Sequence, residues 1–339
     1  MTSTLGPSID MLLRRPGAEL QRVSRSFEET SRARSWYFFV QTFVLLLLAV
    51  AASGVLATVF WPAAILTGTL AGCLIIRAFI LYHDFLHGAI LRGSLIARAV
   101  FSAYGLLVLV PSEAWRRNHN HHHGHVGKPS EFPVGEFPLM TTDEWREAGF
   151  KRRLRYRVMR HPITIALAYV TVFGGHLCLR TFLSNPRRYA SSGLALGLHV
   201  FLIVAIAMAY GPAVVLLAVV LPMTVATAGG ALLFYVQHSF DGAHIHSEDE
   251  WTFHDAALDS SSFLDLGPVM HWLTGNIGYH HVHHLNHKIP FYNLPAAMRS
   301  VPELRDPPVV RPRLSDLSRA FRLALWDTHR EAMVPIPRS

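Results

Sequence analysis

The sequence predicts an all-α integral membrane protein, with four transmembrane helices as two hairpins, interfacial helices and a histidine-rich cytoplasmic cap. Residues 36–76 and 189–240 carry this prediction, because neither stretch contains Asp, Glu, Lys or Arg. Only 16% of the 339 residues are charged, whereas about 25% is usual in soluble domains. Histidine is clustered, since 17 of its 21 residues fall within 83–125 and 238–287.

Each uncharged stretch is long enough for two membrane spans. One helical crossing takes about 20 residues, and the two stretches contain 41 and 52 residues. Turn-forming pairs stand near the middle of each, Trp61-Pro62 in the first and Gly211-Pro212 in the second. We therefore expect spans near residues 37–59, 62–82, 194–210 and 213–236.

The distribution of basic residues predicts the orientation. All 31 Lys and Arg lie outside the two stretches, so neither predicted hairpin tip carries one. Because basic loops favour the cytoplasmic side, we expect both termini and the histidine clusters to be cytoplasmic. The formal net charge of +8 then indicates contact with anionic lipid, along residues 1–35 and 151–160, rather than with nucleic acid.

Two further apolar segments, residues 89–111 and 162–183, are interrupted by arginine. If the histidine clusters share one site, an even number of crossings must separate them, so we expect both segments to be interfacial or re-entrant. Nothing resembling a linker divides the chain. We expect one membrane domain over residues 36–298, a cytoplasmic basic segment before it (1–35) and a cytoplasmic tail after it (299–339).

The first histidine cluster is His83-Asp84-Phe85-Leu86-His87, at the predicted cytoplasmic end of the second span. Residues four apart share one helix face, so both imidazoles can bind one ion. Asp84 can accept a hydrogen bond from the outer N–H of a ligating ring. A pair of interfacial histidines without a metal explains this cluster equally well.

Two more clusters show the spacing i, i+3, i+4: His119, His122 and His123, and then His280, His283 and His284. In the second cluster His121 and His125 form a competing i, i+4 pair, so the spacing leaves open which three residues are ligands. His238 ends the fourth predicted span, at the membrane depth of the first cluster. It is the ninth candidate.

Nine candidate ligands exceed the need of one ion. Zinc takes four protein ligands in a structural site and three in a catalytic one, so nine imidazoles predict two metals. Neutral imidazole suits zinc, iron, copper and nickel, which leaves the metal open. The predicted ligands are His83, His87, His119, His122, His123, His238, His280, His283 and His284.

The three histidine boxes, H-x3-H, H-x2-H-H and H-x2-H-H, resemble those of the membrane fatty acid desaturases. The residues in and around these boxes are most similar to those of the acyl-lipid, delta-12/omega-6-type branch. The resemblance covers about residues 36–298 and is carried by three stretches: His83–Gly88, Trp115–Asn120 and Thr274–Leu285. The segment Phe234–His238, followed by Trp251 and Asp255–Ala257, is also similar to that branch.

Such a resemblance implies two iron ions that activate O2 and remove two hydrogens from an acyl chain. It implies His119, His122 and His123 as the ligands of the second box, and His238 as an additional ligand. It also implies an acyl lipid or acyl thioester as substrate. The electron donor would be a separate ferredoxin or cytochrome b5-type protein.

Several other residues are candidates for supporting roles. We expect Asp255, and more weakly Asp265, to accept hydrogen bonds from ligating rings; a solvated loop carboxylate is the plainer interpretation of Asp265. Tyr235, Trp251 and Trp272 are candidates for the substrate channel, with ordinary packing as the plainer interpretation of each.

Two other functions compete with acyl desaturation. A membrane hydroxylase or ketolase acting on alkanes, sterols or carotenoids resembles it in its histidine boxes and shares the first hydrogen abstraction. A metal transporter or sensor would place histidines and carboxylates inside the spans, near the bilayer midplane. Only His199 lies clearly inside an apolar span, which argues against transport.

Overall fold

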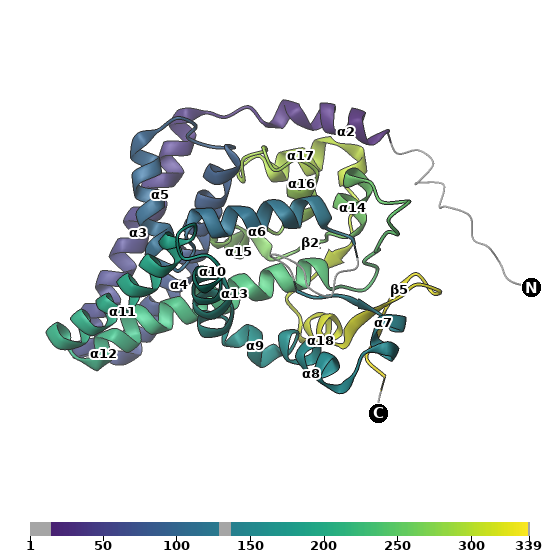
Figure 1. The fold of residues 1–339 in the computed structure, drawn as a ribbon. Coiled ribbons are helices and arrows are strands. Elements are labelled where there is room, and N and C mark those ends of the chain that lie inside the picture. The colour runs from purple at the N-terminus through teal and green to yellow at the C-terminus, as the bar shows by residue number, and fades with distance from the viewer. Residues whose placement is uncertain (1–14, 129–136, 338–339) are drawn as a thin grey trace, which may run out of the picture.

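The structure, a computed structural model, describes residues 15–128 and 137–337 as a mostly helical chain (Figure 1). Within these described residues, four helices are long and apolar enough to cross a membrane. They are α3 (Arg32–Val59), α4 (Trp61–His87), α11 (Ala190–Tyr210) and the run Pro212–His238, made of α12 (Pro212–Val215), η3 (Leu216–Val220) and α13 (Leu221–His238). The four predicted spans are thus confirmed, with the hairpin turns where Pro62 and Gly211 predict them.

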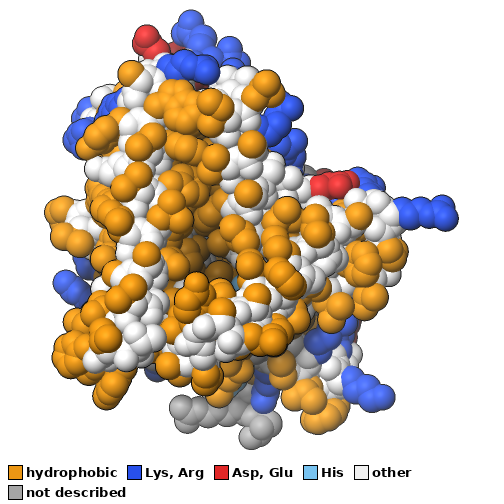
Figure 2. Space-filling view, turned by 90° about the vertical axis from the view of Figure 1, so that its left-hand side faces the viewer, with side chains coloured by type: hydrophobic (Ala, Val, Ile, Leu, Met, Phe, Trp, Pro, Cys, Tyr) orange, Lys and Arg blue, Asp and Glu red, His pale blue; other side chains and the backbone are white. Residues whose placement is uncertain are grey.

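The surface of these helices is apolar. Figure 2 shows the side of the molecule where the long helices lie, covered with hydrophobic side chains, while Lys and Arg gather at its edges. Leu47, Leu66 and Met208, one on each of three different spans, are 68%, 73% and 85% exposed. Large apolar side chains facing outward along whole helices are what a lipid environment favours. The chain is therefore a membrane protein.

Small residues let the two hairpins approach each other. A Cβ atom added at Gly68 of α4 would lie 2.5 Å from the carbonyl oxygen of Leu217, and one at Gly72 would lie 2.8 Å from that of Pro222. Ser53 of α3 is buried and its Oγ lies 2.8 Å from the same Leu217 oxygen. Close backbone contact at small residues is a usual basis of helix packing in membranes.

Replacing Gly72 with alanine is expected to destabilise the protein. The new Cβ would lie 2.6 Å from Val225 Cβ as well as 2.8 Å from the Pro222 oxygen, so α4 and α13 must separate. Overpacking of this kind costs about 1–3 kcal/mol. The check is the thermal unfolding midpoint in detergent. Gly230→Ala is the matched control, because no described atom beyond its own helix backbone and its chain neighbours lies within 4 Å of its added Cβ. Equal midpoints for both variants would contradict the packing.

The two weaker apolar segments do not form straight spans. Helix α5 (Leu95–Leu107) meets α6 (Ser112–His125) at a bend of 88°, and only as a broken pair do they qualify as a fifth span. The other segment is divided among α9 (Pro162–Ala166), the π-helical η2 (Tyr169–Arg180) and α10 (Thr181–Ser184). Their interfacial or re-entrant placement stays a prediction.

Short helices form a cap at one end of the long ones (Figure 1). These are α2 (Gly17–Ser24), η1 (Arg25–Phe27), α14 (Phe253–Asp259), α15 (Gly267–Leu273), α16 (His280–Leu285), α17 (Leu294–Ser300) and η4 (Pro302–Leu304). In Figure 1, α2 lies across the top of the cap, above α14, α16 and α17.

The tail is not separate from the domain before it. Strand β4 (Leu323–Asp327) pairs in parallel with β1 (Met140–Thr141) and antiparallel with β5 (Ala332–Pro335), beside α7 (Thr142–Glu147), α8 (Phe150–Met159) and α18 (Leu314–Arg322). A second pair joins β2 (Phe263–Leu264) to β3 (Val309–Val310). The Tyr156 hydroxyl donates to the Ala324 carbonyl. The described tail is therefore part of the cap, an association of distant segments that the sequence did not predict.

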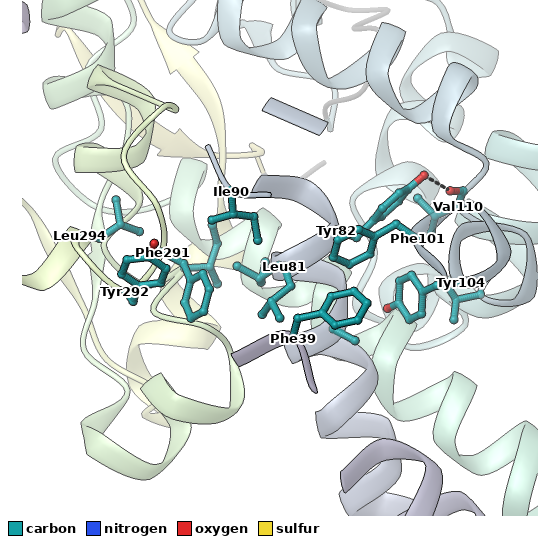
Figure 3. Packing of buried hydrophobic residues seen from close by; sticks show 14 of the residues in the cluster. Phe39, Leu81, Tyr82, Ile90, Phe101, Tyr104, Val110, Phe291, Tyr292 and Leu294 are labelled. Carbon is teal, nitrogen blue, oxygen red and sulfur yellow. Dashed lines mark hydrogen bonds between the residues drawn. The ribbon is translucent and has the colours of Figure 1, made fainter. Parts of the chain in front are cut away.

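A buried aromatic core connects the membrane helices to the cap. Figure 3 shows Phe39 and Leu81 between Tyr82 and Phe101 on one side and Phe291 on the other. The Phe39 and Phe101 ring centroids are 5.2 Å apart, and those of Tyr82 and Phe101 are 5.8 Å apart. Because Phe291 follows the third histidine box, this core helps to hold that box against α4.

Candidate metal centre

The nine predicted ligands come from four helices that end or lie in the cap. His83 and His87 lie one turn apart at the end of α4, with His87 as its last residue, and Gly88 terminates the helix with a left-handed φ of 70°. His238 is the last residue of α13, while the second and third boxes lie on α6 and α16. The two long helices thus deliver their histidines to the membrane-proximal side of the cap.

The structure brings all nine histidines together, in two groups. Within each group one nitrogen per residue lies within 4.8 Å of the corresponding nitrogen of every other member. The five-histidine group consists of His83, His87, His119, His123 and His283, and the four-histidine group of His122, His238, His280 and His284. The two groups adjoin, since the His123 and His284 ring centroids are 4.5 Å apart.

Each H-x2-H-H box divides its ligands between the groups. On α6, His119 and His123 belong to the five-histidine group and His122 to the other. On α16 the division is reversed, because only His283 joins the five-histidine group. The i, i+3, i+4 spacing predicted that the three histidines of each box share one helix face. It did not show that the three divide between two histidine groups.

The geometry of the nitrogens fits bound metal ions. The closest Nε2 atoms within each group are 2.9–3.1 Å apart. With metal–nitrogen bonds of about 2.1 Å, ligands at right angles are about 3.0 Å apart and tetrahedral ligands about 3.4 Å apart. The closest separations are therefore of the size expected between imidazoles that share one metal ion.

Hydrogen bonds at the outer nitrogens turn lone pairs inward. Asp84 Oδ1 lies 3.0 Å from His83 Nδ1, and Asp84 Oδ2 accepts from the Phe291 N–H at 2.7 Å. His238 Nδ1 lies 3.0 Å from the Ser260 carbonyl oxygen. A proton on Nδ1 leaves Nε2 unprotonated in a neutral imidazole. His83 and His238 thus present metal-binding lone pairs, and Asp84 has the position predicted for it.

The third box is buried and uncharged. Burial, together with neighbouring imidazoles, holds the pKa of His280, His283 and His284 well below 6.5. Burial also lowers the pKa of His281 to about 4. Neutral imidazole is the form that binds a metal, so the box is in its binding form at neutral pH.

These pKa values predict a pH dependence of stability. The unfolded chain takes up protons on the third box below pH 6.5, whereas the folded protein leaves His281 neutral to about pH 4 and its neighbours neutral further down. Stability is therefore fully present above pH 6.5 and falls as the pH falls from 6.5 towards 4. Thermal midpoints in detergent at pH 7.5, 6 and 5 measure this. A constant midpoint would contradict it.

The structure also selects among the histidines of the second box. The rings of His121 and His125 stack with their centroids 3.8 Å apart, and both lie outside the two groups. The competing pair is thus turned away from the centre. His287 approaches the centre, with its ring 4.6 Å from that of His87, but belongs to neither group.

Two predicted carboxylate partners lie elsewhere. Asp255 Oδ2 accepts from the Thr252 hydroxyl at 2.6 Å, at the start of α14. Asp265 forms an exposed ion pair with Arg311 at 3.6 Å. Their described partners are thus not ligating rings, and the exposed ion pair of Asp265 agrees with the plainer interpretation of that residue. A carboxylate three residues after a Thr at a helix start is accounted for by capping.

The predicted channel aromatics all have packing contacts. Tyr235 stacks on Phe321 at 4.8 Å, and the Trp251 indole N–H donates to a backbone carbonyl. The Trp272 ring lies 4.2 Å from the guanidinium of Arg77, a buried cation of α4. These contacts account for all three residues without a channel.

Two aromatic residues beside the ligands were not predicted. Trp115 stacks on His119 with centroids 4.2 Å apart, and the Phe234 ring lies 4.8 Å from His122. Phe234 also lies 5.2 Å from His238. A signal was present, because each aromatic stands four residues before a ligand and so shares its helix face.

Comparisons with known proteins agree with this centre. The family model described as "Fatty acid desaturase" matches residues 60–312. A "Fatty acid desaturase" of Bacillus subtilis is 31% identical, over 76% of this chain and 73% of the relative. Two Synechocystis sp. proteins are also similar. The "sn-1 oleoyl-lipid 12-desaturase" is 26% identical over 77% of this chain and 75% of its own length. The "sn-1 acyl-lipid omega-3 desaturase (ferredoxin)" is 24% identical over 72% of this chain and 66% of its own length.

The matched region contains all four helices that supply the two histidine groups. A hydroxylase, ketolase or metal transporter is not favoured by any of these relatives. The chain belongs to the fatty acid desaturase family.

Proposed function

We propose that this desaturase holds two iron ions, one in each histidine group, and uses O2 to introduce a double bond into the acyl chain of a lipid. The observation that carries the proposal is the convergence of nine Nε2 atoms into two adjoining groups. Bound iron would supply the oxidant, formed with O2, that abstracts hydrogen from an unactivated methylene.

The residues around the two histidine groups orient the ligating rings and cover them with apolar surface. Asp84 and the Ser260 carbonyl orient His83 and His238, and oriented rings bind metals more strongly. Trp115 and Phe234 cover the ligating rings with apolar surface. Excluding water in this way protects a reactive site from side reactions.

The position of the centre supports a lipid substrate. The ligands His87 and His238 end helices whose outer surfaces are apolar, and Figure 2 shows that apolar side hollowed near its middle. An acyl chain can approach such a site from within the bilayer. The name of the Synechocystis 12-desaturase likewise specifies an oleoyl lipid.

The reaction needs an electron donor. Forming one double bond while reducing O2 to two water molecules consumes two additional electrons and two protons. We propose a separate donor, a ferredoxin or a cytochrome b5-type protein; ferredoxin appears in the name of one relative. The basic residues outside the spans support a cytoplasmic location for the termini and the metal centre, where such donors are found.

Expression in a host of defined lipid composition tests the function. Fatty acid methyl esters from cells with and without the protein should differ by one new unsaturated species. Purified protein should contain about two iron ions per chain, as nine imidazoles require. New hydroxylated or ketolated products without a new double bond would refute desaturation. Bound zinc with no O2 consumption in the presence of a reductant would refute the iron centre.

A further inference from the structure

Asn286 directly follows α16, the helix of the third histidine box, and its side chain is buried. Its Nδ2 donates to Ser24 Oγ at 2.8 Å and to Glu28 Oε1 at 3.0 Å, although these residues lie 262 and 258 positions away. Its Oδ1 accepts from the Lys288 N–H at 3.1 Å. Both donor hydrogens of the amide are thus used in contacts with the N-terminal part of the chain.

Ser24 and Glu28 belong to a segment, residues 15–35, that we call the N-terminal strap. It contains α2 and η1 and lies along the top of the cap (Figure 1). The strap makes further contacts with the chain after α16. Asn293 Nδ2 lies 3.0 Å from the Phe27 carbonyl oxygen, and the hydroxyls of Tyr292 and Ser35 are 3.0 Å apart.

The strap is also fastened at its beginning. The Arg15 guanidinium donates to both carboxylate oxygens of Glu303 at 2.6 Å, and this bond lowers the pKa of Glu303 to about 2. The sequence predicted this region to be only a basic, lipid-facing surface outside the membrane domain. Its contacts instead join it to the residues that directly follow the third histidine box.

Helix α16 needs such external support. It has only six residues and no side-chain N-cap, and so short a helix is not stable alone. Its orientation therefore depends on anchors: His281 Nε2 lies 3.1 Å from the Leu304 carbonyl oxygen, and Asn286 holds its C-terminal end to the strap.

We propose that the N-terminal strap, through Ser24, Glu28 and Asn286, is a positioning element for the ligands on α16. This rests on the proposed metal centre. Because α16 supplies two of the four ligands of one group but one of the five of the other, a loosened strap should weaken the four-histidine group first.

Asn286→Asp tests the proposal without a change of size. The aspartate loses both donor hydrogens and faces the Glu28 carboxylate. Iron-loaded protein in detergent is mixed with an excess of iron chelator, and iron release is followed over time. Wild type should release its two irons slowly. The variant should release one of them roughly tenfold faster, a loss typical of residues that orient metal ligands, while the other keeps its wild-type rate.

The double variant Glu28→Gln with Asn286→Asp exchanges donor and acceptor between the two positions. It should restore slow release of both irons, which a merely structural weakness at either position would not produce. Ser53→Ala is the control for general destabilisation, because Ser53 hydrogen bonds at the far end of the membrane helices. It should leave the two release rates equal to those of wild type.

Two results separate the possible failures. A wild-type protein that holds fewer than two irons would refute the proposed metal centre, and with it the positioning role. Two irons in wild type, combined with unchanged or equally accelerated release of both in Asn286→Asp, would refute the role of the strap alone.

Discussion

Replacing His283 with alanine should abolish the formation of new double bonds. His283 Nε2 lies 3.1 Å from His123 Nε2 and is buried, so the substitution removes one of five convergent ligands and leaves a cavity beside the centre. We expect no product above the background of the host, and about one iron per chain lost. Methyl ester analysis and metal content measure the two effects.

His121→Ala is the matched control for this result. It removes an imidazole from the densest histidine stretch, but from the pair that stacks outside both groups. Its product yield and iron content should stay close to wild type. A loss of product in His121→Ala equal to that in His283→Ala would mean that the structure assigns the second box incorrectly.

Asp84→Asn should reduce product formation and iron affinity by about 10–100-fold, the usual effect of removing a carboxylate that orients a ligand. The carboxylate is buried and receives both the Phe291 N–H and the His83 ring N–H. An amide has one acceptor oxygen, so it satisfies only one of these donors and turns an N–H towards the other. Iron titration and product yield at saturating iron separate the binding effect from the chemical one.

Asp255→Asn is the corresponding control, because that carboxylate interacts with Thr252 at the start of α14. Its iron affinity should equal that of wild type. If Asp84→Asn bound iron normally while Asp255→Asn did not, Asp255 rather than Asp84 would be the carboxylate that orients a ligating ring.

The membrane helices were predictable almost to their ends. The expected span 62–82 is part of α4, which begins at Trp61, because Trp61-Pro62 is a recognisable turn and helix start. Its other end was placed five residues early, at residue 82 rather than His87. Polar residues such as His83 and Asp84 end a hydropathy pattern, whereas the helix continues wherever the cap buries and hydrogen bonds them.

The supporting residues were predictable only in part. Asp84 was identified because it adjoins a ligand in the chain, so its proximity to His83 is local. Asp255 was selected from a stretch that resembles the family, but its carboxylate instead accepts a hydrogen bond from Thr252, the residue that caps α14. Glu28 and Asn286 gave no local signal, because their contact joins residues 258 positions apart.

The sequence by itself determined which segments are apolar enough to cross the membrane and where the histidine boxes lie, while the family resemblance narrowed the candidate ligands to nine. Hydrocarbon excludes charge over about 20 residues, and helical ligands repeat at i, i+3 and i+4, so both signals are local. Only the tertiary structure decided how the nine divide into two groups, why His121 and His125 stay outside, and that the N-terminal strap holds α16. These features depend on the rotation of helices about each other and on contacts between distant residues, which no local spacing encodes.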